Sequence, residues 1–169
     1  DGPLPEHFEP HEAPVKNLLN GAGGNPCARF TDDPSVRRGN IKDYPYVVTT
    51  YSVVEHWQSG TQTRNIPWLN ELIPSNFIEI SEELAKEKGI RPGDKVRVWN
   101  NRGSVVVDVM ITIRMKPMMI DGKLTHVVGM PHHFSWATKL ATGDNVNDLT
   151  PNVGDPNSYI PEYKAFLVN

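Results

Sequence analysis

The chain has little cysteine, no long apolar run and no excess of positive charge. Cys27 is the only cysteine among 169 residues, which excludes an internal disulfide and a cysteine-rich zinc or iron–sulfur site within this sequence. No apolar run approaches the roughly 20 residues of a membrane-spanning helix, so we expect no direct membrane insertion. The formal net charge is −3, and the lysines and arginines are scattered, which argues against binding to nucleic acid.

Motifs of the common catalytic and metal sites are also missing. The sequence has no G-x-S-x-G, H-E-x-x-H or Walker motif. His7 and His11 have the spacing of a metal-binding pair on a helix, but Pro5 and Pro10 disfavour a helix there. We therefore expect no catalytic residue and no metal ligand in this chain.

Proline, by contrast, is abundant, with 15 residues. Residues 1–45 contain many of these prolines, a glycine-rich run at 21–24 and no periodic apolar pattern. Proline removes backbone donors, and glycine raises the entropic cost of order. We therefore predict two parts: residues 1–45 form an extended arm that packs on neighbouring domains, and residues 46–169 form a folded domain.

The second part has the pattern of a mainly β fold. Short β-branched or alternating segments predict strands at 46–54, 77–80, 95–98, 104–114, 118–120, 123–130 and 163–168. One helix is well marked, because Ser81 is a good N-cap, Gly89 suits the left-handed C-terminal position and Pro92 prevents continuation. The connections are not regular βαβ units. A closed or nearly closed β-barrel with small covering helices fits this pattern best.

The first strand runs into an unusually polar loop. Around Trp57 stand hydrogen-bonding residues at 55, 56, 58, 59 and 61–65. Trp57 has two readings, a core residue or part of a ligand site, and its polar neighbours favour the second. So many donors and acceptors in one loop predict that it holds a large polar cofactor.

Polar residues late in the chain have amide, ammonium and hydroxyl groups that suit phosphate oxygens and purine-like edges. They include Asn147, Tyr163 and Lys164. His132 and His133 would point to opposite faces of a strand, so we expect no shared metal. In an alternative reading, one of them packs inward and the other faces a ligand.

Several segments resemble known molybdenum enzymes. EHWQSGTQTRNIP resembles the EHWHTGTMTRRVP-type segment of periplasmic nitrate reductases. DGPLPEHFEP, FIEISEELAKEKGIRPGDKVRV and LTPNVGDPNSYIPEYKAFLVN resemble the large subunit of membrane-linked or periplasmic formate dehydrogenases, in order and over essentially the whole chain. The chain departs from that pattern at Gln58, where histidine is common, and at 132–134, where Ile-His-Trp is usual.

This resemblance implies a fold and a function. The fold would be the double-psi β-barrel that ends large subunits of the dimethyl-sulfoxide-reductase family. The parent enzyme would be a periplasmic oxidoreductase that interconverts formate and CO2 at molybdenum or tungsten, held by bis-molybdopterin guanine dinucleotide. The metal ligand and an iron–sulfur cluster would lie in other domains, so this chain would be a C-terminal part. Its partners would be the remaining domains and an iron–sulfur electron-transfer subunit.

The resemblance also implies a set of cofactor-binding residues. A first group wraps the pterin and pyrophosphate region, and a second group comes from later segments. They are Thr50, Tyr51, Ser52, Val53, Val54, Glu55, His56, Trp57, Gln58 and Ser59, followed by His132, Asn147, Tyr163 and Lys164.

Two other functions stay open. The chain could be an inter-domain or inter-subunit docking module of a related molybdopterin oxidoreductase, such as periplasmic nitrate reductase. It could also be a free-standing hydrolase or decarboxylase with a similar barrel.

Overall fold

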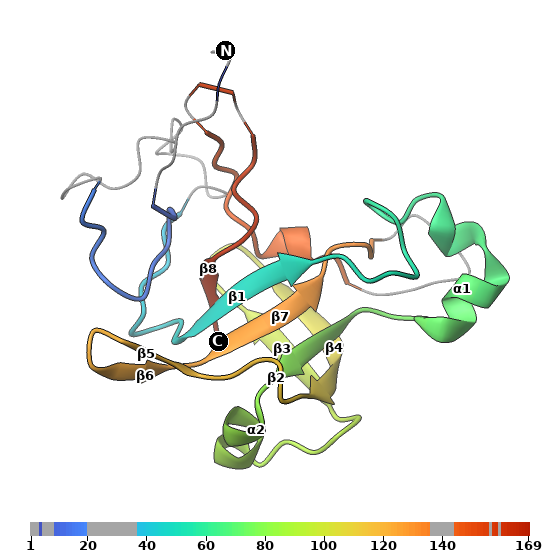
Figure 1. The fold of residues 1–169 in the computed structure, drawn as a ribbon, viewed down its shortest axis with the longest axis horizontal. Coiled ribbons are helices and arrows are strands. Elements are labelled where there is room, and N and C mark those ends of the chain that lie inside the picture. The colour runs from blue at the N-terminus through green and yellow to red at the C-terminus, as the bar shows by residue number, and fades with distance from the viewer. Residues whose placement is uncertain (1–3, 5–8, 20–36, 136–143, 156, 159) are drawn as a thin grey trace.

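The fold is mainly β, as the sequence predicts. The computed structural model describes residues 4, 9–19, 37–135, 144–155, 157–158 and 160–169. Six strands form one mixed sheet in the order β3-β4-β2-β7-β1-β8. Their bounds are β1 Tyr46–Tyr51, β2 Phe77–Ile80, β3 Lys95–Trp99, β4 Ser104–Ile111, β7 Val127–Pro131 and β8 Phe166–Val168. A separate two-stranded sheet pairs β5, Met118–Ile120, with β6, Lys123–Thr125 (Figure 1).

Two parallel strand pairs define the topology. β1 runs parallel to β7, and β2 runs parallel to β4. β2 and β7 pair antiparallel through Glu79 and Gly129, which joins the two pairs. The edge strands also meet: Trp99 N–H donates to the Asn169 carbonyl at 2.8 Å, and Asn169 N–H donates to the Trp99 carbonyl at 2.9 Å. The sheet therefore curls until its two edges touch.

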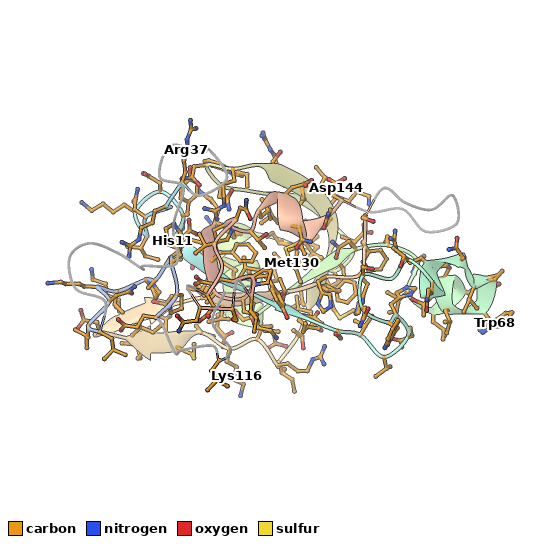
Figure 2. All side chains as sticks on the ribbon, turned by 90° about the horizontal axis from the view of Figure 1, so that it is seen from above. His11, Arg37, Trp68, Lys116, Met130 and Asp144 are labelled. Carbon is orange, nitrogen blue, oxygen red and sulfur yellow. The ribbon has the colours of Figure 1, made fainter. Side chains whose placement is uncertain are left out.

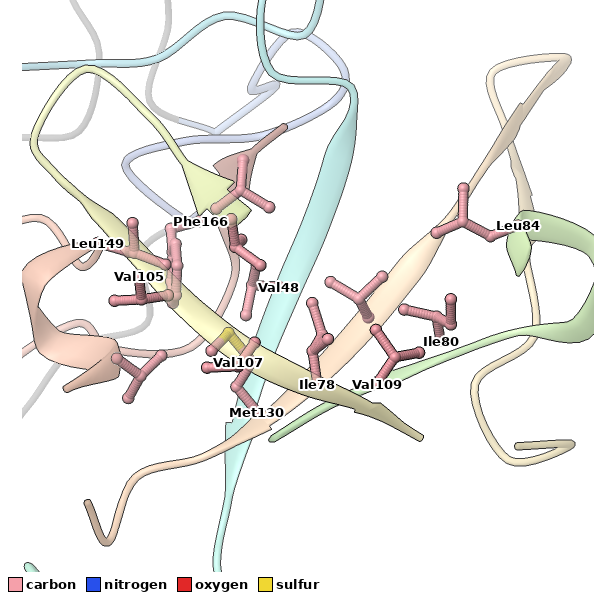
Figure 3. Packing of buried hydrophobic residues seen from close by; sticks show 14 of the residues in the cluster. Val48, Ile78, Ile80, Leu84, Val105, Val107, Val109, Met130, Leu149 and Phe166 are labelled. Carbon is pink, nitrogen blue, oxygen red and sulfur yellow. The ribbon is translucent and has the colours of Figure 1, made fainter. Parts of the chain in front are cut away.

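The core lies inside this curled sheet. β4 shows the strand period of two most clearly, because Val105, Val107 and Val109 are buried whereas Val106 and Met110 are exposed. The inward-facing valines belong to one cluster with aliphatic side chains of β1, β2, β7 and β8 (Figure 3). Burial of this apolar cluster provides the main stabilisation of the sheet.

The helical elements are short. They are the 3-10 helices η3, Thr63–Asn65, and η4, Val146–Asp148, and the α-helices α1, Pro67–Leu72, and α2, Glu82–Lys88. α2 confirms the predicted caps, because Ser81 Oγ accepts from Leu84 N–H at 3.1 Å and Gly89 adopts a φ of 68°. No helix in the described ranges combines the length and apolarity that crossing a membrane requires.

Some predicted strands end earlier than their β-branched composition suggests. The first ends at Tyr51 instead of residue 54, the return strand ends at Ile111 instead of 114, and the last covers only Phe166–Val168. The predicted strand at 123–130 is two strands, because β6 closes the hairpin whereas β7 pairs with β1 and β2. Composition alone cannot show where a strand loses its neighbour.

The described residues of the predicted arm lie against the curled sheet. Glu12 is 1% exposed and forms an ion pair with Arg102, whose Nη2 donates to Glu12 Oε2 at 3.0 Å. Leu167 N–H of β8 donates to the same oxygen at 2.7 Å. This carboxylate therefore fixes the arm to β8 and to the β3–β4 turn. His7 and residues 20–36 lie outside the described residues, and packing of the arm on neighbouring domains stays a prediction.

Candidate functional site

A polar cavity of about 660 Å³ opens where four segments meet. Its lining residues are Gln58, Ser59, His132, Asn147, Thr150, Pro151, Asn152, Pro161, Glu162 and Tyr163. Half of them belong to the set of cofactor-binding residues predicted from the sequence. The other half are neighbours of predicted residues along the chain, and only their position beside Asn147 and Tyr163 could have indicated them.

A second cavity, of about 260 Å³, lies beside α2. It is lined mainly by aliphatic side chains such as Ile78, Leu84 and Val98. Such a lining offers few groups that could orient a polar ligand. The larger cavity is therefore the candidate site for a ligand rich in hydrogen-bonding groups.

Parallel pairing of β1 and β7 creates one side of the site. Tyr51 pairs with Pro131 at the ends of the two strands, so the chain leaves both strands at the same edge of the sheet. His132 N–H donates to the Tyr51 carbonyl at 3.2 Å, and Ser52 Oγ lies 3.5 Å from His132 Nε2. The segments after residues 51 and 131 therefore emerge side by side.

The C-terminal segment is held against β1 by two hydrogen bonds. Thr50 Oγ1 donates to the Tyr163 carbonyl at 2.8 Å, and Lys164 Nζ donates to the Thr50 carbonyl at 3.2 Å. Ala165 N–H then donates to the Val48 carbonyl at 2.9 Å, where β8 begins to pair with β1. These contacts place Tyr163 in the wall of the cavity and Lys164 beside it.

Asn147 is presented by a short 3-10 turn. The side chain of Asn145 caps η4 by accepting from Asn147 N–H at 3.0 Å. Thr150 Oγ1 donates to the Asn147 carbonyl at 3.1 Å, while Val146 and Leu149 are fully buried in the core. Because Val146 and Leu149 hold the apolar side of the turn in the core, its polar side faces the cavity.

The two adjacent histidines do not point to opposite faces, which corrects that expectation. Their ring centroids are 4.5 Å apart, because both residues follow Pro131, where β7 ends. His133 is fully buried: its Nε2 accepts from Val53 N–H at 2.9 Å and its Nδ1 donates to the Gln58 carbonyl. His132 lines the cavity. His133 therefore packs inward, as the alternative reading expected, whereas contact of His132 with a ligand stays a prediction.

Other predicted site residues do not line the cavity. His56 is buried, with Nδ1 3.2 Å from Thr63 Oγ1 and Nε2 2.9 Å from the Ile73 carbonyl. It therefore shapes the loop from within. Trp57 is 56% exposed, so the core reading of this residue is wrong. Val54 is almost fully exposed as well.

Three more members of the predicted set also lie outside the cavity wall. The ring of Tyr51 covers Gly129, and burial together with the Glu79 carboxylate raises the pKa of the Tyr51 phenol. Val53 takes part through its backbone N–H, which binds His133. Glu55 is partly exposed. Any contact of these residues with a ligand stays a prediction.

Glu162 is the acidic residue among those that line the cavity. Burial raises the pKa of Glu162 to about 7, although the carboxylate accepts from His11 N–H at 2.6 Å. Burial and the nearby Lys164 ammonium lower the pKa of His132, so that its ring is neutral at pH 7. Within the described residues, no group of three or more His, Cys, Asp or Glu could hold a metal. The arrangement suits a neutral or anionic ligand bound through hydrogen bonds.

Comparison with known proteins identifies the class. Residues 46–167 match the family described as Molydopterin dinucleotide binding domain. This match covers more than half of the chain, and the chain belongs to that family.

Similarity over the whole of this chain extends to individual proteins. The chain is 47% identical over 172 residues to formate dehydrogenase subunit alpha of Megalodesulfovibrio gigas. It is 41% identical over 171 residues to the nitrate-inducible formate dehydrogenase major subunit of Escherichia coli. Each match covers 100% of this chain and 17% of the relative. The chain thus spans about one sixth of the length of these relatives.

A solved structure shares the fold. Acetylene hydratase from Pelobacter acetylenicus matches with a TM-score of 0.54 and 15% sequence identity. The match covers 76% of this chain and 18% of that chain. At this identity the likeness concerns the fold alone.

Proposed function

We propose that the chain binds bis-molybdopterin guanine dinucleotide as the C-terminal part of the large subunit of a formate dehydrogenase. One observation carries the proposal: residues from four separate segments, Gln58, Ser59, His132, Asn147 and Tyr163, line one cavity. Similarity to formate dehydrogenase subunits over 100% of the chain supports the parent enzyme.

The donors present fit this cofactor. Amide groups of Gln58, Asn147 and Asn152 can pair with the edges of a pterin or guanine, and Thr150 and Ser59 add hydroxyl groups. Lys164, beside the cavity, suits a phosphate oxygen. The volume of about 660 Å³ lies within the range of ligand pockets, and other domains would enclose the remainder of so large a group.

The chain contributes binding and orientation. When bound, the cofactor supplies the redox chemistry of its molybdenum or tungsten ion. The residues named here would hold and bury the dinucleotide, while the metal ligand and the formate site would lie in other parts of the subunit. In this proposal, the side chains that line the cavity do not act as acids or bases.

We also propose the finer features of the assembly. Two parallel strand pairs and joined sheet edges support a double-psi barrel. The family match that begins at residue 46 supports a boundary between an arm, 1–45, and a barrel, 46–169. An iron–sulfur cluster elsewhere in the enzyme, an iron–sulfur electron-transfer subunit as a partner, and a periplasmic location follow from the resemblance to formate dehydrogenases.

Cofactor content tests the proposal. In the full-length large subunit, the double variant Asn147→Ala and Lys164→Ala should lose most of its pterin and metal, measured by pterin fluorescence and metal analysis per polypeptide. Lys116→Ala, which changes an exposed lysine away from the cavity, is the control. Full pterin and metal content in the double variant would show that these two assignments are wrong.

A second function, docking, is favoured by one surface. Trp68 and Leu72 of α1 are 68% and 64% exposed, and Trp68 lies at the outer end of that helix (Figure 2). Exposed apolar residues of this size are typical of an interface. If Trp68→Ser weakens assembly of the enzyme but leaves the pterin content per subunit intact, docking is a separate function of α1.

A further inference from the structure

Arg64 is a fully buried arginine close to the candidate site. It follows the polar loop, in η3, and is 0% exposed. Within the described ranges no carboxylate pairs with it. The cost of burying a guanidinium is usually offset by an ion pair. The absence of one here among the described residues raises the question of what this side chain does.

Its hydrogen bonds join two segments that both reach the cavity. Nη1 donates to the Ser135 carbonyl at 2.7 Å, and Nη2 donates to Ser135 Oγ at 2.9 Å. Nη2 also lies 3.4 Å from the carbonyl oxygen of Ser59, a residue of the cavity wall. The planar fork of the guanidinium can hold both segments at once, which a lysine ammonium cannot reproduce.

Gly60 shows how closely the two segments approach. Its φ is 75°, and a Cβ at this position would lie 2.3 Å from the His133 carbonyl oxygen and 2.8 Å from Arg64 Nε. His133 crosses the same gap with hydrogen bonds to Val53 and Gln58. A neutral ring that accepts at Nε2 and donates at Nδ1 meets both bonds.

A further bond holds the arginine itself. Asn70 Nδ2 donates to the Arg64 carbonyl at 2.6 Å, and Asn70 is buried. The backbone of η3 is therefore fixed by α1. The guanidinium is thus attached to a stable support, while the two segments that it joins are loops.

We propose that Arg64 is a positioning residue for cofactor binding: its guanidinium sets the spacing between the Gln58–Ser59 rim and the segment that carries His132. This inference rests on the proposed function. Since Arg64 is completely covered, it acts through Ser59 and Ser135 and does not touch the ligand. Loss of the fork would let the rim move away from His132 and would weaken retention of the dinucleotide.

The test compares Arg64→Lys with Val107→Ala in the full-length enzyme. Arg64→Lys keeps the positive charge and removes the fork. Val107 is 1% exposed in the core, so Val107→Ala should lower thermal stability while replacing no residue of the cavity wall. Release of pterin from the purified enzyme after dilution is followed by fluorescence. We expect release to be roughly tenfold to a hundredfold faster in Arg64→Lys, by analogy with the loss of metal affinity when residues that orient metal ligands are changed, and nearly unchanged in Val107→Ala.

Amide hydrogen exchange provides a readout that does not need the cofactor. Arg64→Lys should speed exchange at residues 58–60 and leave β4 protected, whereas Val107→Ala should speed exchange in β4. Equal pterin release from the two variants would overturn the role of Arg64 while the proposed function stands. Wild-type enzyme that is purified without any pterin would overturn both.

Discussion

Thr50 Oγ1 donates a hydrogen bond of 2.8 Å to the carbonyl oxygen of Tyr163, although 113 residues separate the two. Thr50 is 1% exposed, so its hydroxyl is shielded from solvent and depends on this bond. This bond, together with the one from Lys164 to the Thr50 carbonyl, joins the first half of the candidate site to the last.

Thr50→Val should therefore separate these halves. The change keeps the shape of the side chain but leaves a carbonyl without its donor, which costs about 1–3 kcal/mol. Urea unfolding of the chain measures this loss. Thr61→Val, at an exposed position, should change the free energy of unfolding by less than about 0.5 kcal/mol. Equal effects would show that the Thr50 bond contributes nothing specific.

Glu12→Gln should destabilise the chain strongly. It would leave the buried Arg102 guanidinium without its counter-charge, which costs roughly 3–5 kcal/mol. Asp108→Asn breaks the Lys95–Asp108 pair, whose side chains are 66% and 36% exposed, and should cost less than about 1 kcal/mol. Both are measured by urea unfolding at pH 7. A small effect at Glu12 would contradict its role in anchoring the arm.

Glu162 should make stability depend on pH. Its pKa is raised from 4.5 to about 7 in the folded state, so its contribution is fully present below pH 4.5 and is lost as the pH rises to about 7. Glu162→Gln keeps an acceptor for His11 N–H but cannot ionise. Between low and neutral pH, its free energy of unfolding should therefore fall by roughly 1–3 kcal/mol less than that of the wild type. Unfolding at pH 5 and pH 8 measures the difference, and an identical pH dependence in the variant would refute it.

Gly60→Ala should cost more than Gly89→Ala. Both glycines have positive φ, 75° and 68°, so both substitutions carry a backbone penalty of about 1 kcal/mol. At Gly60 the new Cβ would also meet the His133 carbonyl oxygen at 2.3 Å, whereas nothing lies within 4 Å at Gly89. Thermal unfolding of the two variants separates the effects. Equal losses would mean that the loop at Gly60 adapts.

Local features were predictable because a few neighbouring residues determine them. The caps of α2 depend on Ser81 and Gly89, and the burial pattern of β4 follows its alternating valines. The polar composition around Trp57 indicated a loop outside the core, and polar side chains late in the chain already pointed to Asn147 and Tyr163. Strand ends were less predictable, since a residue such as Val54 has strand composition but no strand partner.

The two adjacent histidines show where prediction from the sequence fails. A period of two places neighbouring side chains on opposite faces only while the strand continues. Pro131 ends β7, and the rings of His132 and His133 then lie 4.5 Å apart. Nothing near them in the sequence indicates the partners of His133, because Val53 and Gln58 come from a segment that parallel pairing brings alongside.

The sequence by itself determined the mainly β class, the caps of α2, the polar loop after β1 and the family. Only the tertiary structure decided that one cavity collects Ser59, His132, Asn147 and Tyr163, that Glu12 is buried against Arg102, and that Arg64 joins two loops. Capping and alternation are settled by hydrogen bonds and burial within a few residues. The site instead depends on strand pairings between segments far apart in the chain, and these pairings stabilise the site only once the whole sheet has formed.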